Sequence, residues 1–110
     1  MTTDNAVLDR VFDALANEPR REIVARLSRG PMTTPDVGRH FGFSRQALSR
    51  HVSVLEAAGL IARTPRGRVH ELALVAAPLA DLSRWVDIVR QGWEASLDRL
   101  GDVLGGGHDG

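Results

Sequence analysis

The chain has 110 residues, of which 43% are hydrophobic, and its 14 arginines equal its acidic residues in number. This length suits one compact domain, which at this size often gains stability by pairing with a second copy. The chain contains no cysteine, which excludes disulfides, thiolate metal sites and a cysteine nucleophile. No stretch has the pattern of a membrane span or a secretory signal, so we expect a cytoplasmic protein.

The charges are distributed unevenly along the chain. Residues 20–70 carry ten arginines against three acids, a net charge of +7, and the other residues carry the compensating −7. Attraction to phosphate depends on such a local concentration of positive charge, whatever the total charge of the protein. The distribution predicts a basic region that meets a polyanion, between two acidic ends that do not.

Two amphipathic helices are predicted in the N-terminal part of the chain. Apolar residues between positions 5 and 16 recur at the spacing of one helical face. They are Val7, Leu8, Val11, Phe12 and Leu15. Asn17 followed by Glu18 and Pro19 is typical of a helix start, so a second helix begins there and ends before Gly30.

Residues 34–58 predict a helix-turn-helix. Thr34 is expected to cap a short helix that ends at Gly42. Ser44 is expected to cap the next helix, which ends at Gly59 in a left-handed conformation. A short turn containing glycine between two helices is the mark of this motif. The inward face of the second helix is predicted as Ala47, Leu48, His51 or Val52, and Leu55.

The segment 60–74 predicts a β-hairpin, the wing. Two short runs suited to β-strands flank Pro65, Arg66 and Gly67, a combination that favours a turn. Arg63 and Arg68 lie close to the same turn, so the tip of the wing is basic.

A single long helix is predicted for residues 78–104. Apolar residues recur there at spacings close to a heptad, and about 27 residues at ~1.5 Å each give a length of roughly 40 Å. Because this exceeds what a small core covers, we expect the helices 5–16 and 78–104 to form a dimer interface. A pocket for an effector is the alternative role for Trp85 and Trp93 of the longer helix. The predicted interface residues are Val7, Val11, Leu82, Trp85, Val86, Val89, Trp93, Leu97 and Leu100. Residues 105–110 are expected to form a disordered tail.

The expected fold is mainly α with a small β-hairpin, a winged helix-turn-helix in the order α-α-α-α-β-β-α within one domain, residues 1–104. The second helix of such a motif enters the major groove of duplex DNA with its N-terminal residues at the base edges. Arginine suits guanine and glutamine suits adenine in that groove. The predicted DNA contacts are Thr33, Ser44, Arg45, Gln46, Ser49, Arg50, His51, Arg63, Arg66 and Arg68.

A resemblance to a known family is carried by residues 44–72, which read SRQALSRHVSVLEAAGLIARTPRGRVHEL. This stretch resembles the recognition helix and wing of the ArsR/SmtB family of bacterial repressors. Residues 14–30, ALANEPRREIVARLSRG, are similar to another segment of that family, so the resemblance covers about residues 10–75. It implies a homodimeric, autoregulatory repressor that binds an imperfect palindrome at its own promoter.

The chain departs from this family at the positions where metal-sensing members bind metal. Their Cys-x-Cys box corresponds to residues 33–37, which contain no cysteine, and their Asp-x-His positions read Asp81-Leu82-Ser83 or Asp87-Ile88-Val89. The resemblance therefore implies the subgroup without metal sites. No cofactor and no metal ligand are expected, and the effector is unknown.

Other functions stay open beside this one. The runner-up is a metal-responsive repressor with histidine and carboxylate ligands across the dimer, and a winged-helix adaptor for other proteins is a further alternative. An enzyme is not expected, because the histidines are scattered and paired carboxylates and phosphate-binding glycine loops are missing from the sequence. Ser49, Arg50 and His51 have a second interpretation as a solvated helix face, and His51 also as a buried, hydrogen-bonded support of its helix.

Overall fold

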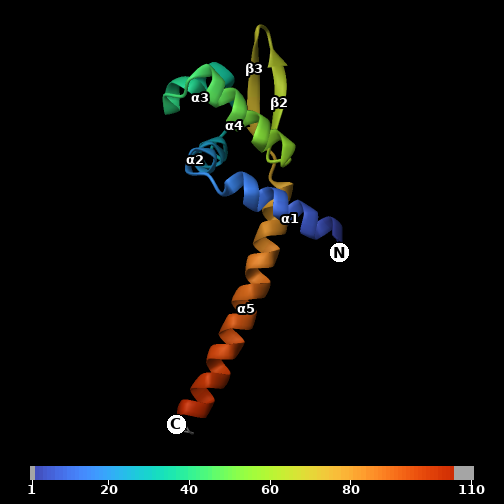
Figure 1. Ribbon diagram of the computed structural model, residues 1–110, viewed down its shortest axis with the longest axis vertical. Helices are drawn as coiled ribbons and strands as arrows, with labels where there is room; N and C mark the ends of the chain where they lie inside the picture. The colour runs from blue at the N-terminus through green and yellow to red at the C-terminus, as the bar shows by residue number, and fades with distance from the viewer. Residues whose placement is uncertain (1, 106–110) are drawn as a thin grey trace.

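The computed structural model describes residues 2–105, with side chains for residues 5–103, and this part of the chain forms five helices and a small sheet (Figure 1). The elements in chain order are α1 (Thr2–Leu15), α2 (Glu18–Leu27), β1 (Met32–Thr33), α3 (Thr34–Phe41), α4 (Arg45–Ala57), β2 (Ile61–Arg66), β3 (Val69–Leu74) and α5 (Ala77–Gly105). The predicted fold class, mainly helical with a β-hairpin wing, is confirmed. Strand β1 was not predicted, because two residues carry no periodic pattern.

The sheet has three antiparallel strands in the order β1-β3-β2. In the hairpin, Ile61 lies opposite Leu74 and Arg66 lies opposite Val69, so only Gly67 and Arg68 remain in the turn. The hairpin is confirmed, but its turn comes later than the predicted Pro65-Arg66-Gly67, because Pro65 is accommodated within β2. This strand is at the edge of the sheet, where a proline is tolerated.

The core collects one or more buried side chains from each of α1 to α4 and from the sheet. Its members are Ala14, Ile23, Val24, Leu27, Val37, Val52, Leu55, Leu60, Ile61 and Leu72. On α4, Val52 and Leu55 are buried, whereas His51 is half-buried, so Val52 takes the position for which the sequence offered two candidates. Each fully buried aliphatic side chain contributes roughly 1.5–3 kcal/mol to folding.

The helix ends agree with the predicted caps at three positions of four. Asn17 accepts a hydrogen bond from the Arg20 amide at 3.1 Å, Ser44 caps α4, and Gly59 has the left-handed φ of 74° that ends this helix. The predicted Thr34 cap is wrong by one residue. Thr33 has the extended backbone of a cap and accepts from the Asp36 amide, whereas Thr34 is already helical.

Two arginines of α2 hold the C-terminal end of α1. Arg20 donates from Nε to the carbonyl of Ala14 at 2.6 Å, and Arg21 donates from Nη1 to the carbonyl of Leu15 at 2.8 Å. The last carbonyls of a helix have no partner within it and carry partial negative charge, so guanidinium groups stabilise them. These contacts fix α1 against α2.

Helix α5 leaves the remainder of the domain and extends alone in the view of Figure 1, and the whole molecule measures 68 Å along its longest axis. Near its start, Trp85 packs edge-on against Phe12 of α1, with ring centroids 5.4 Å apart. Further along, the apolar side chains are exposed, 63% for Trp93 and 52% for Leu100. Among the described residues, no helix is both long enough and apolar enough to cross a membrane.

The predicted interface residues differ in burial, and the predicted tail lies only partly within the described residues. Val11 is completely buried in its own chain and presents no surface to a partner, since α1 packs this side of the helix inward. Val7 and Leu82 are half-buried, and the remaining predicted interface residues are exposed. Gly105 belongs to α5, whereas the predicted tail positions 106–110 lie outside the described residues.

Candidate nucleic-acid interface

The front of α4 presents a group of exposed polar side chains. They are Ser44, Arg45, Gln46, Ser49 and Arg50. Gln46 and Arg50 lie roughly on the opposite side of this helix from the buried Val52 and Leu55 and point away from the core, whereas Arg45 and Ser49 lie beside Val52 at the edge of the buried face. Within the described part of the chain, Arg45 and Arg50 have no ion pair and no side-chain hydrogen bond that would occupy them.

A shallow pocket of about 170 Å³ joins this front to the neighbouring elements. Leu48 and Val52 give it an apolar lining, while Thr34 at the start of α3, Arg45 and Ser49 of α4, and Arg63 of β2 are its polar members. Three segments that are distant in the sequence therefore meet on one surface. Their combination of arginine and hydroxyl groups suits phosphate and base edges.

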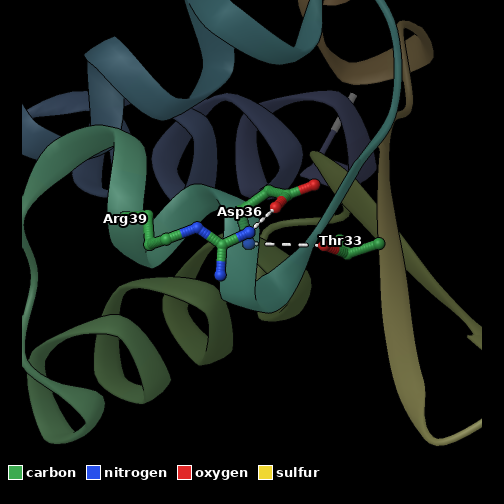
Figure 2. A network of polar contacts seen from close by, with 3 residues as sticks. All are labelled: Thr33, Asp36 and Arg39. Carbon is green, nitrogen blue, oxygen red and sulfur yellow. Dashed lines mark hydrogen bonds and ion pairs between the residues drawn. The ribbon is translucent and has the colours of Figure 1, made fainter.

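Two hydroxyl groups on this side of the molecule cap helices. Figure 2 shows Thr33 facing the amide of Asp36, whose carboxylate in turn contacts Arg39; the amide donates to Thr33 Oγ1 at 3.3 Å. Ser44 Oγ accepts from the amide of Ala47 at 3.1 Å. A hydroxyl that accepts in this way still has its own proton to donate. Both caps can therefore serve a phosphate, a ligand that helix N-termini favour.

The three wing arginines differ in their surroundings. Arg63 donates from Nε and Nη2 to the two carboxylate oxygens of Glu56, at 3.0 and 2.6 Å. Arg66 reaches only Oε1 of Glu71, at 3.3 and 3.2 Å from Nε and Nη2. Arg68 is exposed in the turn and has no ion pair among the described residues. The wing thus presents one unpaired and two paired cations.

The ion pair between α4 and β2 changes the titration of both partners. The hydrogen bond from Arg63 lowers the pKa of Glu56 and outweighs the opposing effect of burial. The same bond raises the pKa of Arg63. Both groups are therefore held in their charged forms, which strengthens the hydrogen bonds between them.

His51 lies behind the front of α4 and is half-buried. Its ring packs at a tilt against Phe43, with centroids 5.1 Å apart, and its Nδ1 is buried without a hydrogen-bond partner in the described structure. Burial lowers the pKa of His51, and the charges of Arg20 and Arg50 lower it further. A neutral packed ring favours the interpretation of His51 as a support of the helix, although the expected hydrogen bond is missing at Nδ1.

Half of the basic region is occupied by contacts within the fold. Of its ten arginines, Arg20 and Arg21 hold α1, while Arg39, Arg63 and Arg66 form ion pairs. The others have no such contact among the described residues; they are Arg26, Arg29, Arg45, Arg50 and Arg68. Sequence reasoning missed Glu56 and Glu71 as partners. Cross-strand spacing offered a signal for Glu71, whereas Glu56 is separated from Arg63 by the turn at Gly59.

The alternative function predicted from the sequence is metal binding by histidine and acidic side chains. Between residues 5 and 103, the part with described side chains, no three histidine or acidic residues lie close enough together to hold an ion. His108 is outside this range.

Comparison of the sequence with known families and proteins gives concordant matches. A family model described as a helix-turn-helix domain matches residues 15–64. The HTH-type transcriptional regulator Rv2034 of Mycobacterium tuberculosis is 38% identical over 98 residues, which covers 86% of this chain and 92% of that protein. The transcriptional repressor SdpR of Bacillus subtilis is 30% identical over 79 residues, 72% of this chain and 88% of that protein.

Solved structures of similar shape include transcriptional regulators. A crystal structure of an ArsR family transcriptional regulator has a TM-score of 0.75 and 31% identity, and the match covers 82% of this chain and 93% of that one. A winged helix-turn-helix domain of Mycobacterium bovis, described as homodimeric, has a TM-score of 0.64 over 78% of this chain and 80% of that one. At 23% identity, this second structure shows the fold alone.

Proposed function

The chain belongs to the ArsR family of winged helix-turn-helix transcriptional regulators, and we propose that it is a dimeric repressor that binds an imperfect palindrome through α4 and the wing. Its relatives are transcriptional regulators with a DNA-binding fold and not enzymes. This protein is likewise a DNA-binding transcriptional regulator and not an enzyme. The observation that carries the proposed site is the pocket that unites Arg45 and Ser49 of α4 with Arg63 of the wing.

In this proposal α4 lies in the major groove of duplex DNA. Arg45 and Arg50 are exposed and free of intramolecular ion pairs in the described structure, so each can donate two hydrogen bonds to guanine. Gln46 can serve adenine in the same way. Ser44 and Thr33 donate their hydroxyl protons to the phosphates beside the groove, and the N-termini of α4 and α3 favour the same negative charge.

The wing contacts the DNA backbone next to the groove. Arg68 is in the turn of the hairpin and has no ion pair in the described part of the chain, so its charge is available to phosphate. Arg63 and Arg66 approach DNA already paired with carboxylates. Contacts of this kind give affinity and fix the register without reading the sequence.

The second copy of the chain covers the exposed apolar face of α5. Val86, Val89, Trp93, Leu97 and Leu100 recur at heptad-like spacing and are all exposed in the single chain. The homodimeric domain of Mycobacterium bovis, which shares this fold, supports such pairing. A two-fold axis would present two α4 helices to half-sites about 34 Å apart, one turn of DNA.

The experiment that tests this function uses the full chain with a duplex selected by the wild-type protein from a random pool. Arg50→Ala is expected to weaken binding to that duplex about 10-fold to 100-fold, the discrimination given by one bidentate base contact. Binding is measured by mobility shift and the dimer by sedimentation. Arg99→Ala, which removes the same charge from α5, is the control. Equal affinity of Arg50→Ala and wild type would remove α4 from the proposed interface.

A further inference from the structure

We infer that Glu56 is a positioning residue for DNA binding, one that holds the guanidinium of Arg63 on the DNA-facing surface beside Arg45 and Ser49. The inference rests on the proposed function and deepens it, because it assigns a role to an acidic residue on a surface that meets a polyanion. An acid in that place opposes DNA by its charge, so its presence next to the wing calls for a compensating role.

The geometry of the Glu56 and Arg63 pair is that of a fixed clamp. Both carboxylate oxygens are engaged, by Nε at 3.0 Å and by Nη2 at 2.6 Å. The pair connects the last turn of α4 with β2 across the turn at Gly59, where the amide of Leu60 bonds the carbonyl of Leu55 at 3.0 Å. A bidentate contact fixes the plane of the guanidinium as well as its position.

Arg63 keeps the capacity to bind a second anion while it is clamped. A guanidinium has five N–H donors, and the two bonds to Glu56 leave the others for a phosphate. Its side chain is 34% exposed and lines the same pocket as Arg45 and Ser49. Glu56 also offsets the repulsion between the two arginines that share this pocket.

Arg66, the other paired arginine of the wing, makes a looser contact with its carboxylate. Arg66 shares a single oxygen of Glu71 between Nε and Nη2, at 3.3 and 3.2 Å, and its side chain is 64% exposed. Exposed pairs of this kind contribute little and hold the side chain loosely. Glu71 therefore lowers the charge of the wing without positioning a cation, which makes it the natural comparison for Glu56.

A Glu56 that acts only through its charge and a Glu56 that positions Arg63 predict opposite changes in DNA affinity for the same substitution. If Glu56 acted only through its charge, Glu56→Gln would strengthen DNA binding, because a negative charge leaves the surface that faces phosphate. If Glu56 positions Arg63, Glu56→Gln weakens binding, because the guanidinium becomes mobile and must be ordered when DNA binds.

The test measures the affinity of full-length variants for the duplex that the wild-type protein selects from a random pool. Glu56→Gln is expected to weaken binding about threefold, the scale of one partly exposed ion pair. Glu71→Gln is expected to strengthen it slightly, and Asp98→Asn on α5 is the control for the loss of one charge. Thermal denaturation of each variant verifies that it is folded. Affinity of Glu56→Gln equal to or above that of wild type would overturn the inference.

A second measurement separates positioning from a purely structural connection. The double variant Glu56→Gln with Arg63→Ala is expected to bind no more weakly than Arg63→Ala alone, because Glu56 acts through Arg63. The exchanged pair, Glu56→Arg with Arg63→Glu, keeps an ion pair between α4 and β2 but moves the cation, and it is expected to remain weak. Restoration of wild-type affinity by this exchange would show that only the connection matters.

These results also distinguish the inference from the function on which it rests. If the wild-type protein selects no duplex, the proposed function fails and the inference with it. If wild type binds and Arg50→Ala binds about 10-fold or more weakly, but Glu56→Gln leaves the affinity unchanged, then only the inference fails.

Discussion

The two ends of this molecule both present exposed side chains, but one end is polar and the other is apolar. At one end, α4 and the wing present arginines, serines and a glutamine around a core that is already complete. At the other, α5 extends away from that core (Figure 1). Its side chains Trp93, Leu97 and Leu100 are exposed in the single chain. Exposure of an arginine to water carries no free-energy cost, whereas exposure of a row of apolar side chains is unfavourable.

The two ends therefore suit partners of different chemistry. The polar end is stable as it stands and gains only from a partner that is itself charged, such as DNA. The apolar end has no apolar partner in the single chain, and in the proposed dimer a second copy would supply that surface by symmetry. Substitutions at the two ends should therefore change different measurements.

The largest effect is expected at the apolar end. Leu97→Glu places a charge in the face that a second copy covers in the proposed dimer, so we expect the dimer dissociation constant to rise about 100-fold, equivalent to about 3 kcal/mol. DNA affinity falls as well, because two linked half-site contacts become separate ones. Sedimentation at a series of concentrations measures the dimer.

The control for this change lies on the same helix. Gln91 is about half a turn away from the face that contains Trp93 and Leu97, given 3.6 residues per turn. Gln91→Glu adds the same charge and should leave the dimer intact. Equal dissociation in both variants would mean that charge on α5, and not loss of apolar contact, had separated the chains.

A smaller effect is expected at the polar end. Arg68→Ala removes a wing cation that has no ion pair in the described structure, so DNA binding should weaken several-fold for every sequence. The slope of log affinity against log salt should decrease by about 0.9, the value for one phosphate contact. Titrations at four salt concentrations measure it, with Arg99→Ala as the control. A slope identical to that of wild type would separate Arg68 from the DNA backbone.

The smallest effect concerns stability and pH. Because the pKa of Glu56 is lowered in the folded state, its ion pair stabilises the protein above the unfolded pKa, and this contribution is lost as the pH falls through the folded pKa. For a partly exposed pair it amounts to less than about 1 kcal/mol. Urea denaturation should show wild type more stable than Glu56→Gln at pH 7, and a smaller difference at pH 3. A difference independent of pH would point to packing in place of charge.

The sequence predicted those parts of the structure that have a local cause. The apolar spacing of α5, the caps at Asn17 and Ser44 and the left-handed Gly59 depend on a few neighbouring residues, and all are present. Strand β1 depends on pairing with β3, forty residues away in the case of Met32 and Leu72, and no local pattern announces it.

The candidate site was predictable in outline and not in its charges. Arg45 and Arg50 were both predicted to be exposed on α4, and both are. The partners of Arg63 and Arg66 are brought to them by tertiary structure, so counting arginines along the sequence overstated the free positive charge of the wing. The burial of Val11 has the same origin, since a stripe on a helix does not reveal whether it faces its own chain or another.

The contacts of Arg20 and Arg21 with the end of α1 have a mechanical consequence. Only two residues, Ala16 and Asn17, connect α1 to α2, and a link that short would act as a hinge if nothing else joined the helices. Hydrogen bonds of 2.6 and 2.8 Å across it turn the hinge into a rigid corner. We therefore expect α1 and α2 to rotate as one body, so that a shift of α1 at the proposed subunit boundary would be carried into the half of the molecule with the proposed DNA-binding surface.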